Sequence, residues 1–265
     1  MNYTLGFIGC GNMGGALVSA AAKTIGGEKI AVYDYAKEKC ERLKDTLGVA
    51  TPERKMLARL SKFILLCVKP QNMQETVQTL MQEMGEREDV VLVTIAAGIS
   101  IKAIQEFAGK ALPVIRIMPN TPVLVGEGMI VYDSKGVSQE DEKLFVACFE
   151  KAGILDKLPE DKIDAASAVS GCGPAFAYLF AEALADGGVE CGLPRDKAAL
   201  YTAQTLLGAA KMLLEYGNPS ALKDAVCSPG GTTIAGVHAL EKDGLRAAGM
   251  DAVTAAYKRT LELKK

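Results

Sequence analysis

A glycine-rich turn near the start of the chain constrains the fold more than any other stretch. An apolar run at residues 5–8 leads into Gly-Cys-Gly-Asn-Met-Gly at 9–14, and a helical pattern follows at 16–23. Strand, Gly-x-Gly-x-x-Gly turn and helix open a dinucleotide-binding unit, because the glycines let the backbone approach a pyrophosphate at the helix N-terminus. The residues expected to contact the dinucleotide are Gly9, Cys10, Gly11, Asn12 and Met13. The alternative is a glycine turn kept only for packing of helix on sheet.

An acidic residue follows this turn at the distance typical of such units. Asp34 comes directly after the apolar strand at residues 30–33. A carboxylate there can bind both ribose hydroxyls of NADH and repel a 2′-phosphate, or it can cap the helix at 37–47. Lys37 and Lys39 offset the repulsion, so both NADH and NADPH remain open as cofactors.

Apolar strands and helices alternate through the first part of the chain, which predicts a parallel sheet covered on both faces. The later expected strands are 63–68, 90–95, 114–118, 129–132 and 154–158, with helices at 71–84, 101–108 and 139–151. Ligands of open α/β sheets gather at the carboxyl ends of the strands. The residues assigned to a cofactor cleft at those ends are Cys67, Val68, Lys69, Pro70, Ala96, Ala97, Gly98 and Asn120. Taken singly, each of these segments also fits an ordinary turn.

The pattern changes near residue 160. From there it predicts helices only, at about 161–190, 195–215, 219–226, 233–241 and 244–263. A chain of 265 residues suits two modest domains. We therefore expect an α/β fold: an N-terminal Rossmann-type, doubly wound, mostly parallel sheet over 1–160, followed by an all-α dimerisation and substrate-binding domain over 161–265.

A second glycine-rich turn, Ser-Pro-Gly-Gly at residues 228–231, precedes a helix that Thr232 or Thr233 can start. Such a turn points backbone N–H groups at one spot, with the positive end of the helix dipole behind them. That is a site for a small anion such as a carboxylate. The hydroxyls of Ser228, Thr232 and Thr233 add donors. The alternative is a helix N-cap that binds only water.

An uncharged segment at residues 165–181 is rich in small residues. Small residues allow close approach of helices, and an uncharged helix needs partners on all sides. The helices after residue 160 are too few to bury it, which favours a homodimer with intertwined helices over the core helix of a monomer. Ser170, Gly171 and Pro174 within the segment argue against a membrane span.

Composition excludes several classes of function. A net charge of −2 without a basic run argues against nucleic acid as a partner. The single histidine, His238, argues against a histidine metal site, and we expect no metal. Seven scattered cysteines without a Cys-x-x-Cys pair, and no recognisable secretion signal, indicate reduced thiols in a cytoplasmic protein.

Further motifs make the chain resemble the pyrroline-5-carboxylate reductase family. They are Val-Lys-Pro at 68–70, Ala-Ala-Gly at 96–98, Met-Pro-Asn-Thr-Pro at 118–122, Ser-Gly-Cys-Gly-Pro-Ala at 170–175, Ala-Asp-Gly-Gly-Val at 185–189, Leu-Lys-Asp at 222–224 and Cys-Ser-Pro-Gly-Gly-Thr-Thr-Ile at 227–234. The last block is highly specific to this family, whereas the N-terminal glycine turn is shared with many dehydrogenases. The resemblance covers essentially the whole chain.

The resemblance implies hydride transfer from NADH or NADPH to the C=N carbon of L-Δ1-pyrroline-5-carboxylate, giving L-proline in the last step of proline biosynthesis. It also implies an interlocked homodimer that can assemble into a larger ring, with each active site near the dimer interface. By position, residues 9–13 hold the pyrophosphate and 96–98 flank the nicotinamide. The residues implied for the substrate are Ser228, Gly230, Gly231, Thr232 and Thr233. Thr233 is the candidate catalytic residue, donating to the imine nitrogen.

Departures from the family pattern leave the cofactor contacts and preference open. Many members have a small polar residue or threonine near Asp34, some have Asn where this chain has Ala225, and Arg54 replaces an Asn that often helps bind the ribose. Two rival functions also remain. A β-hydroxyacid dehydrogenase uses a lysine on its long helix, but no Lys or Arg lies between Ile163 and Pro194. A non-catalytic cofactor scaffold or redox sensor needs no substrate pocket, and the block at 228–233 argues against it. Imine reduction suits a chain with one histidine, because the cofactor supplies the difficult chemistry.

Overall fold

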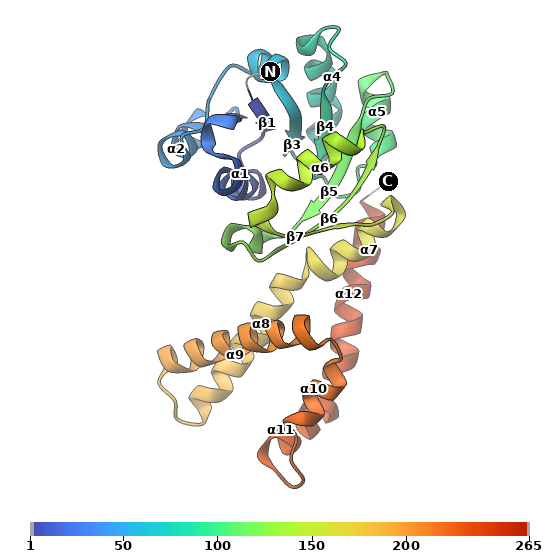
Figure 1. Ribbon diagram of the computed structural model, residues 1–265. Coiled ribbons are helices and arrows are strands. Elements are labelled where there is room, and N and C mark those ends of the chain that lie inside the picture. Colours follow the sequence, from blue (N-terminus) through green and yellow to red (C-terminus); the bar gives the residue numbers. More distant parts are fainter. Residues whose placement is uncertain (1–2, 264–265) are drawn as a thin grey trace. The chain divides into compact units, whose positions relative to one another are not determined.

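The computed structural model describes residues 3–263, and its contacts divide the chain into two compact units. The first unit runs to Cys172 and takes in the segment from Ala256 onward, and the second runs from Gly173 to Ala255. Figure 1 shows that the first unit holds the sheet and that the second is built of helices. The expected fold class, a Rossmann-type sheet followed by a helical part, is confirmed.

The first unit is built around a seven-stranded sheet in the order β2-β1-β3-β4-β5-β6-β7. The strands are β1 (Tyr3–Ile8), β2 (Ile30–Tyr33), β3 (Ser61–Leu66), β4 (Val91–Thr94), β5 (Val114–Pro119), β6 (Gly128–Lys135) and β7 (Gly153–Lys157). Neighbouring strands are parallel except β5 and β6, which are antiparallel. Because β1 lies between β2 and β3, the chain reverses direction across the sheet there. The carboxyl ends of β1 and β3 therefore form the topological switch point where such folds bind ligands.

Helices cover both faces of this sheet (Figure 1). One hydrophobic cluster contains the inner residues of α1 (Asn12–Ile25), α2 (Lys37–Leu47) and α6 (Gln139–Cys148). The other contains those of α3 (Arg54–Leu60), α4 (Met73–Met84) and α5 (Ile101–Ala108). Alternate residues of β1, β2, β3 and β4 supply the two clusters, as Phe7 does for the first and Ile8 for the second. Full burial of such a side chain stabilises the fold by about 1.5–3 kcal/mol.

Helix α7 (Glu160–Ser170) is fastened to the sheet by charged groups. The Asp164 carboxylate pairs with the guanidinium of Arg116 on β5 at 2.5 Å, and each residue is 1% exposed. The Glu160 carboxylate lies 3.6 Å from the same guanidinium and accepts the N–H of Ile101 at 2.7 Å. Asp133 accepts the N–H of Glu160 at 2.8 Å, which satisfies a donor at the start of α7. The contacts of α7 therefore keep it in the first unit.

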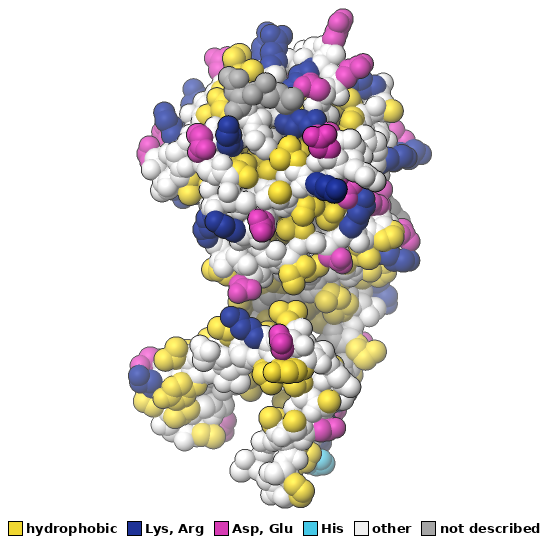
Figure 2. Space-filling view, in the orientation of Figure 1, with side chains coloured by type: hydrophobic (Ala, Val, Ile, Leu, Met, Phe, Trp, Pro, Cys, Tyr) yellow, Lys and Arg dark blue, Asp and Glu magenta, His cyan; other side chains and the backbone are white. Residues whose placement is uncertain are grey.

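The second unit exposes much of its apolar surface. Its helices are α8 (Gly173–Glu190), α9 (Arg195–Tyr216), α10 (Pro219–Ala225), α11 (Thr232–Lys242) and most of α12 (Leu245–Glu262). Only Ala185, Ala198 and Thr202 are buried among its residues. Tyr178, Leu179 and Leu214 are each at least 64% exposed, and Figure 2 shows apolar side chains in yellow on this surface. Contiguous apolar surface of this kind marks an interaction face.

The structure departs from the sequence-based expectations in two places. A short helix, α3, follows Pro52 where no helix was expected. The helix expected at 161–190 is two helices, because the chain turns at Gly171 and Cys172 and Pro174 stands in the first turn of α8. Proline is tolerated in a first turn but not in a helix interior. Four short 3-10 turns also occur: η1 (Gly27–Lys29), η2 (Pro70–Asn72), η3 (Thr121–Val125) and η4 (Glu150–Ala152).

Within residues 3–263, one helical stretch, Glu160–Glu190, is long and apolar enough to cross a membrane by length and composition. The turn at Gly171 and Cys172 divides it into α7 and α8. A helix that packs against other protein passes the same test.

Candidate active site

The three glycines of the first turn have separate roles in its geometry. Gly9 has a φ of +103°, a conformation that favours glycine, and a Cβ there would lie 2.5 Å from the carbonyl oxygen of Cys67. A Cβ on Gly14 would collide with the carbonyl oxygen of Gly9, so α1 packs closely on the turn. A Cβ on Gly11 would meet nothing within 4 Å. Gly11 is also the N-cap of α1 without a side-chain cap, which leaves the helix N-terminus accessible to an anion.

A cavity of about 650 Å³ opens at the switch point, beside this turn. It is lined by the ends of β1, β2 and β3 and by α4. Six of the residues predicted to bind the cofactor lie on its wall: Gly9, Gly11, Asp34, Cys67, Val68 and Lys69. The other eight, which do not line this cavity, are Cys10, Asn12, Met13, Pro70, Ala96, Ala97, Gly98 and Asn120. The cavity size and the glycine turn fit the pyrophosphate and adenosine parts of a dinucleotide.

Asp34 links the glycine turn to the loop after β2. Its Oδ2 accepts the N–H of Cys10 at 2.7 Å, and its Oδ1 accepts the N–H of Ala36 at 2.9 Å. The N-cap of α2 is Ala36, so the alternative that Asp34 caps this helix is wrong. The N–H of Cys10 is engaged by this carboxylate, whereas the first N–H groups of α1 have no acceptor within the helix and are available to an anion. Lys39 lies 3.9 Å from Oδ2 and partly offsets its charge.

Ten residues of the cavity wall were not predicted as site residues: Ile8, Tyr33, Tyr35, Lys39, Arg54, Gln71, Asn72, Glu75, Thr76 and Thr79. Arg54 is the first residue of α3, the helix that the sequence pattern did not reveal. Its Nη1 donates to the Tyr35 hydroxyl at 3.1 Å, and its guanidinium lies 5.7 Å from the centroid of the Tyr33 ring. In the sequence, the one sign that Arg54 belongs to the site was that it replaces an Asn of the family pattern. This part of the cavity wall therefore consists of two tyrosine rings and the guanidinium that contacts them.

Three cysteines lie near the turn, of which Cys10 and Cys40 are buried and Cys67 is half-buried. Cys10 and Cys40 have their sulfur atoms 3.9 Å apart, and Cys67 lines the cavity. Burial raises the pKa of all three thiols above its usual value. The thiolate is the reactive form of cysteine, so these side chains act here as small apolar groups.

Asn120 holds two segments of the first unit together. Its Nδ2 donates to the carbonyl of Ser170 at 3.0 Å, and its Oδ1 accepts the N–H of Met129 at 2.9 Å. The side chain is 8% exposed. These bonds tie the end of α7 to the ends of β5 and β6, which gives Asn120 a structural role in addition to the predicted cofactor contact.

The second glycine-rich turn lies in the second unit. Gly231 donates its N–H to the carbonyl of Ser228 at 3.0 Å, and Gly230 has a φ of +69°. Proline followed by glycine with positive φ is the sequence that a tight turn of type II requires. Helix α11 then begins at Thr232, and its N-cap, Gly231, has no side-chain cap. The N–H groups of Thr232 and Thr233 lie in the first turn of α11, where the helix itself offers no acceptor.

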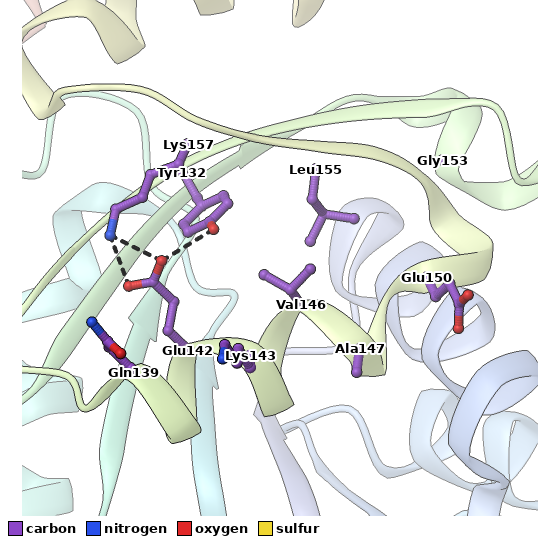
Figure 3. A pocket seen from close by; sticks show the side chains of 10 residues that line it. All are labelled: Tyr132, Gln139, Glu142, Lys143, Val146, Ala147, Glu150, Gly153, Leu155 and Lys157. Carbon is purple, nitrogen blue, oxygen red and sulfur yellow. Dashed lines mark hydrogen bonds and ion pairs between the residues drawn. The ribbon is translucent and has the colours of Figure 1, made fainter.

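A second cavity, of about 780 Å³, lies between α6 and the edge of the sheet, away from the glycine turn (Figure 3). Glu142 accepts hydrogen bonds from Lys157 at 2.8 Å and from the hydroxyl of Tyr132 at 3.2 Å. Burial raises the pKa of Tyr132 to about 12. Burial also acts to raise the pKa of Glu142, but the hydrogen bonds from Lys157, Ser134 and Tyr132 and the charge of Lys157 together hold it below its usual value. The two opposite charges neutralise each other, so this cluster fastens α6 to β6 and β7.

The family to which this chain belongs follows from its similarity to known proteins. Residues 160–263 match the pyrroline-5-carboxylate reductase dimerisation family, and residues 4–98 match the coenzyme F420-dependent NADP oxidoreductase family. A pyrroline-5-carboxylate reductase of Pisum sativum is 42% identical over 99% of this chain and 96% of its own. One of Escherichia coli strain K12 is 38% identical over the whole of both chains. The chain belongs to the pyrroline-5-carboxylate reductase family.

Solved structures of this family agree with that assignment. The Plasmodium falciparum pyrroline carboxylate reductase with NADP bound superposes with a TM-score of 0.88 at 33% identity, covering 100% of this chain and 99% of its own. The pyrroline-5-carboxylate reductase of Coxiella burnetii gives a TM-score of 0.90 at 32% identity over both whole chains. The resemblance seen in the motifs is therefore confirmed. The chain is an NAD(P)H-dependent oxidoreductase that acts on a CH–NH group, and the β-hydroxyacid dehydrogenase alternative falls away.

Proposed function

We propose that this chain reduces L-Δ1-pyrroline-5-carboxylate to L-proline with the residues of its two glycine-rich turns. The observation that supports this most directly is the Ser228–Gly231 turn leading into α11, whose helix N-terminus fits a small carboxylate. The cofactor supplies the hydride that reaches the C=N carbon. The protein's task is then to bind both molecules and to fix their orientation.

The predicted cofactor residues divide this task among themselves. The N–H groups at the start of α1 hold the pyrophosphate, with Gly11 leaving the space for its approach. Lys69, at the end of β3, adds a cation to the same cavity. Ala96, Ala97 and Gly98 follow β4 at the same edge of the sheet and flank the nicotinamide.

The predicted substrate residues lie at the second turn: Ser228, Gly230, Gly231, Thr232 and Thr233. The N–H groups of Thr232 and Thr233 bind the carboxylate, because the Gly231 N–H is already bonded to Ser228. The Thr233 hydroxyl donates to the ring nitrogen. A threonine hydroxyl is a poor proton source at neutral pH, so it orients the imine and stabilises the amine as it forms.

Thr233→Ala tests this assignment. We expect turnover to fall by roughly 10- to 100-fold, the loss that about 1.4–3 kcal/mol of transition-state stabilisation represents. Cofactor affinity and melting temperature should change little, because Gly231 and not Thr233 is the N-cap of α11. Steady-state kinetics and thermal melting on the same preparation measure both effects.

Two matched variants serve as controls. Thr233→Ser keeps the hydroxyl and should recover most of the rate. Thr254→Ala removes an exposed threonine of α12 and should leave the rate unchanged. A Thr233→Ala protein with full turnover and a lowered melting temperature would leave Thr233 only a structural role. An absence of NADH or NADPH oxidation with the imine in the native protein would favour the cofactor scaffold instead.

The position of Asp34 predicts the direction of a change in cofactor preference. Asp34→Ser should raise kcat/KM with NADPH relative to NADH by roughly 10-fold, since the carboxylate that repels a 2′-phosphate is removed. Initial rates with the two cofactors side by side measure this ratio. If the native protein already uses NADPH far better and the substitution leaves the ratio unchanged, Asp34 only shapes the loop between Cys10 and Ala36.

Family membership brings oligomerisation and a small-molecule substrate to this chain. We propose a homodimer as its minimum unit, assembling further into a ring, and a cytoplasmic location. The apolar surface of α8 and α9 supports the dimer. The division into residues 1–160 and 161–265 stays a prediction: the matched dimerisation family begins at residue 160, whereas the contacts of α7 keep it with the sheet.

A further inference from the structure

Arg54 stands at the cavity wall in an unfavourable place for a cation. It is the first residue of α3, where the helix dipole is positive, and the first turn of that helix has no acidic residue. Its side chain is 18% exposed. A cation in this position needs a counter-charge from outside the helix.

Glu83, near the end of α4, supplies that charge through two hydrogen bonds. Nε of Arg54 donates to Oε2 at 2.9 Å, and Nη2 donates to Oε1 at 3.1 Å. The Nη1 atom donates to the Tyr35 hydroxyl at 3.1 Å. Three of the five N–H donors of the guanidinium are therefore engaged. Both groups are largely buried, at 18% and 21% exposure, which strengthens the pairing relative to an open surface pair.

The ion pair between Arg54 and Glu83 affects how the adenosine end of a dinucleotide can bind. Arg54, Tyr35 and Asp34 line the same cavity, and the dinucleotide's ribose binds next to the residue that ends β2. A free arginine beside that ribose attracts a 2′-phosphate with its paired N–H groups. Here two neighbouring N–H groups of Arg54 already donate to Glu83, and the negative charge of Glu83 cancels that of the guanidinium.

We propose that Glu83, acting through Arg54, sets how this chain discriminates between NADPH and NADH. In the native protein the pair is neutral and gives a 2′-phosphate no advantage over a hydroxyl. Glu83 is a positioning residue, because it does not line the cavity itself. The inference rests on the proposal that the dinucleotide occupies the cavity at the switch point.

The test is Glu83→Gln, with 2′,5′-ADP and 5′-AMP as probes. These nucleotides differ only in the 2′-phosphate, and isothermal titration calorimetry gives the Kd of each without turnover. Glutamine keeps the size of the side chain and removes its charge. We expect the affinity for 2′,5′-ADP relative to 5′-AMP to rise by roughly 10-fold, the range of a charge-assisted hydrogen bond. The kcat/KM ratio of NADPH to NADH should rise in parallel.

Two variants separate this effect from a general change in charge. Glu86→Gln removes an exposed carboxylate three residues further along and should leave the ratio unchanged. Arg54→Met combined with Glu83→Gln removes the guanidinium and should abolish the gain. A gain that survives in the double variant would overturn the role of Arg54.

The possible results also distinguish this inference from the proposal on which it rests. An unchanged nucleotide ratio in Glu83→Gln, with 5′-AMP still bound and the fold intact by circular dichroism, overturns the inference alone. Equal weakening of both nucleotides gives Glu83 a structural role only and also overturns it. Failure of the native chain to bind either nucleotide in competition with NADPH would overturn the placement of the cofactor and this inference together.

Discussion

A chain carrying Ala175→Glu is expected to sediment as a monomer and to lose nearly all activity. Ala175 lies on α8, next to the exposed side chains of Tyr178 and Leu179. An unpaired carboxylate in a closely packed helix interface costs several kcal/mol per subunit, enough to prevent association at micromolar concentration. Analytical ultracentrifugation across a dilution series measures the outcome.

Ala147→Glu is the matched control for that experiment. Ala147 is exposed on α6 in the first unit, so the same substitution should change neither sedimentation nor activity. An Ala175→Glu protein that remains dimeric would place the interface on another face of the helices. A folded and active native monomer at low concentration would end the dimer proposal.

Arg116→Met is expected to destabilise the first unit by about 3–5 kcal/mol. The substitution removes the guanidinium from the buried ion pair with Asp164, and breaking a buried ion pair by removing one member costs this much. It also removes the cation beside Glu160, which holds the start of α5. Urea denaturation, followed by far-ultraviolet circular dichroism, gives the free energy of unfolding.

The double variant Arg116→Met with Asp164→Leu distinguishes charge from packing. Replacing both members of a buried ion pair with apolar residues is often neutral, so we expect most of the lost stability to return. If the double variant were as unstable as Arg116→Met, the volume and shape of the arginine would account for the loss.

The sequence predicted the sheet well because its signals are local. Apolar runs between glycine-rich turns marked the strands, and the glycine turn and Asp34 lie on the wall of a cavity at the switch point. Helix α3 escaped prediction because its seven residues are shorter than two helical turns and have no capping side chain. The break between α7 and α8 was missed because small residues fit a continuous apolar helix equally well.

Contacts between distant residues account for what the sequence did not reveal about the site. Arg54 and Glu83 are 29 residues apart, and the tight pairing of their charges depends on how α3 packs beside α4. The hydrogen bond from the N–H of Cys10 to Asp34 likewise joins residues far apart in the sequence, at the ends of β1 and β2. Residue type and spacing predicted Asp34 and Cys10 as site residues but not Arg54 or Glu83, and in both pairs the partner follows from packing.

Few residues of the helical unit are buried within a single chain, so the two units differ in what their folding requires. The first unit has its own core on both faces of the sheet, so it can form in a step that depends on one chain alone. The second unit buries few side chains without a partner, and its folding is then linked to association. If the chain forms the proposed dimer, we expect the sheet unit to fold independently of chain concentration and the stability of the helical unit to rise with it. The amount of folded helical unit would then depend on how many copies of the chain are present.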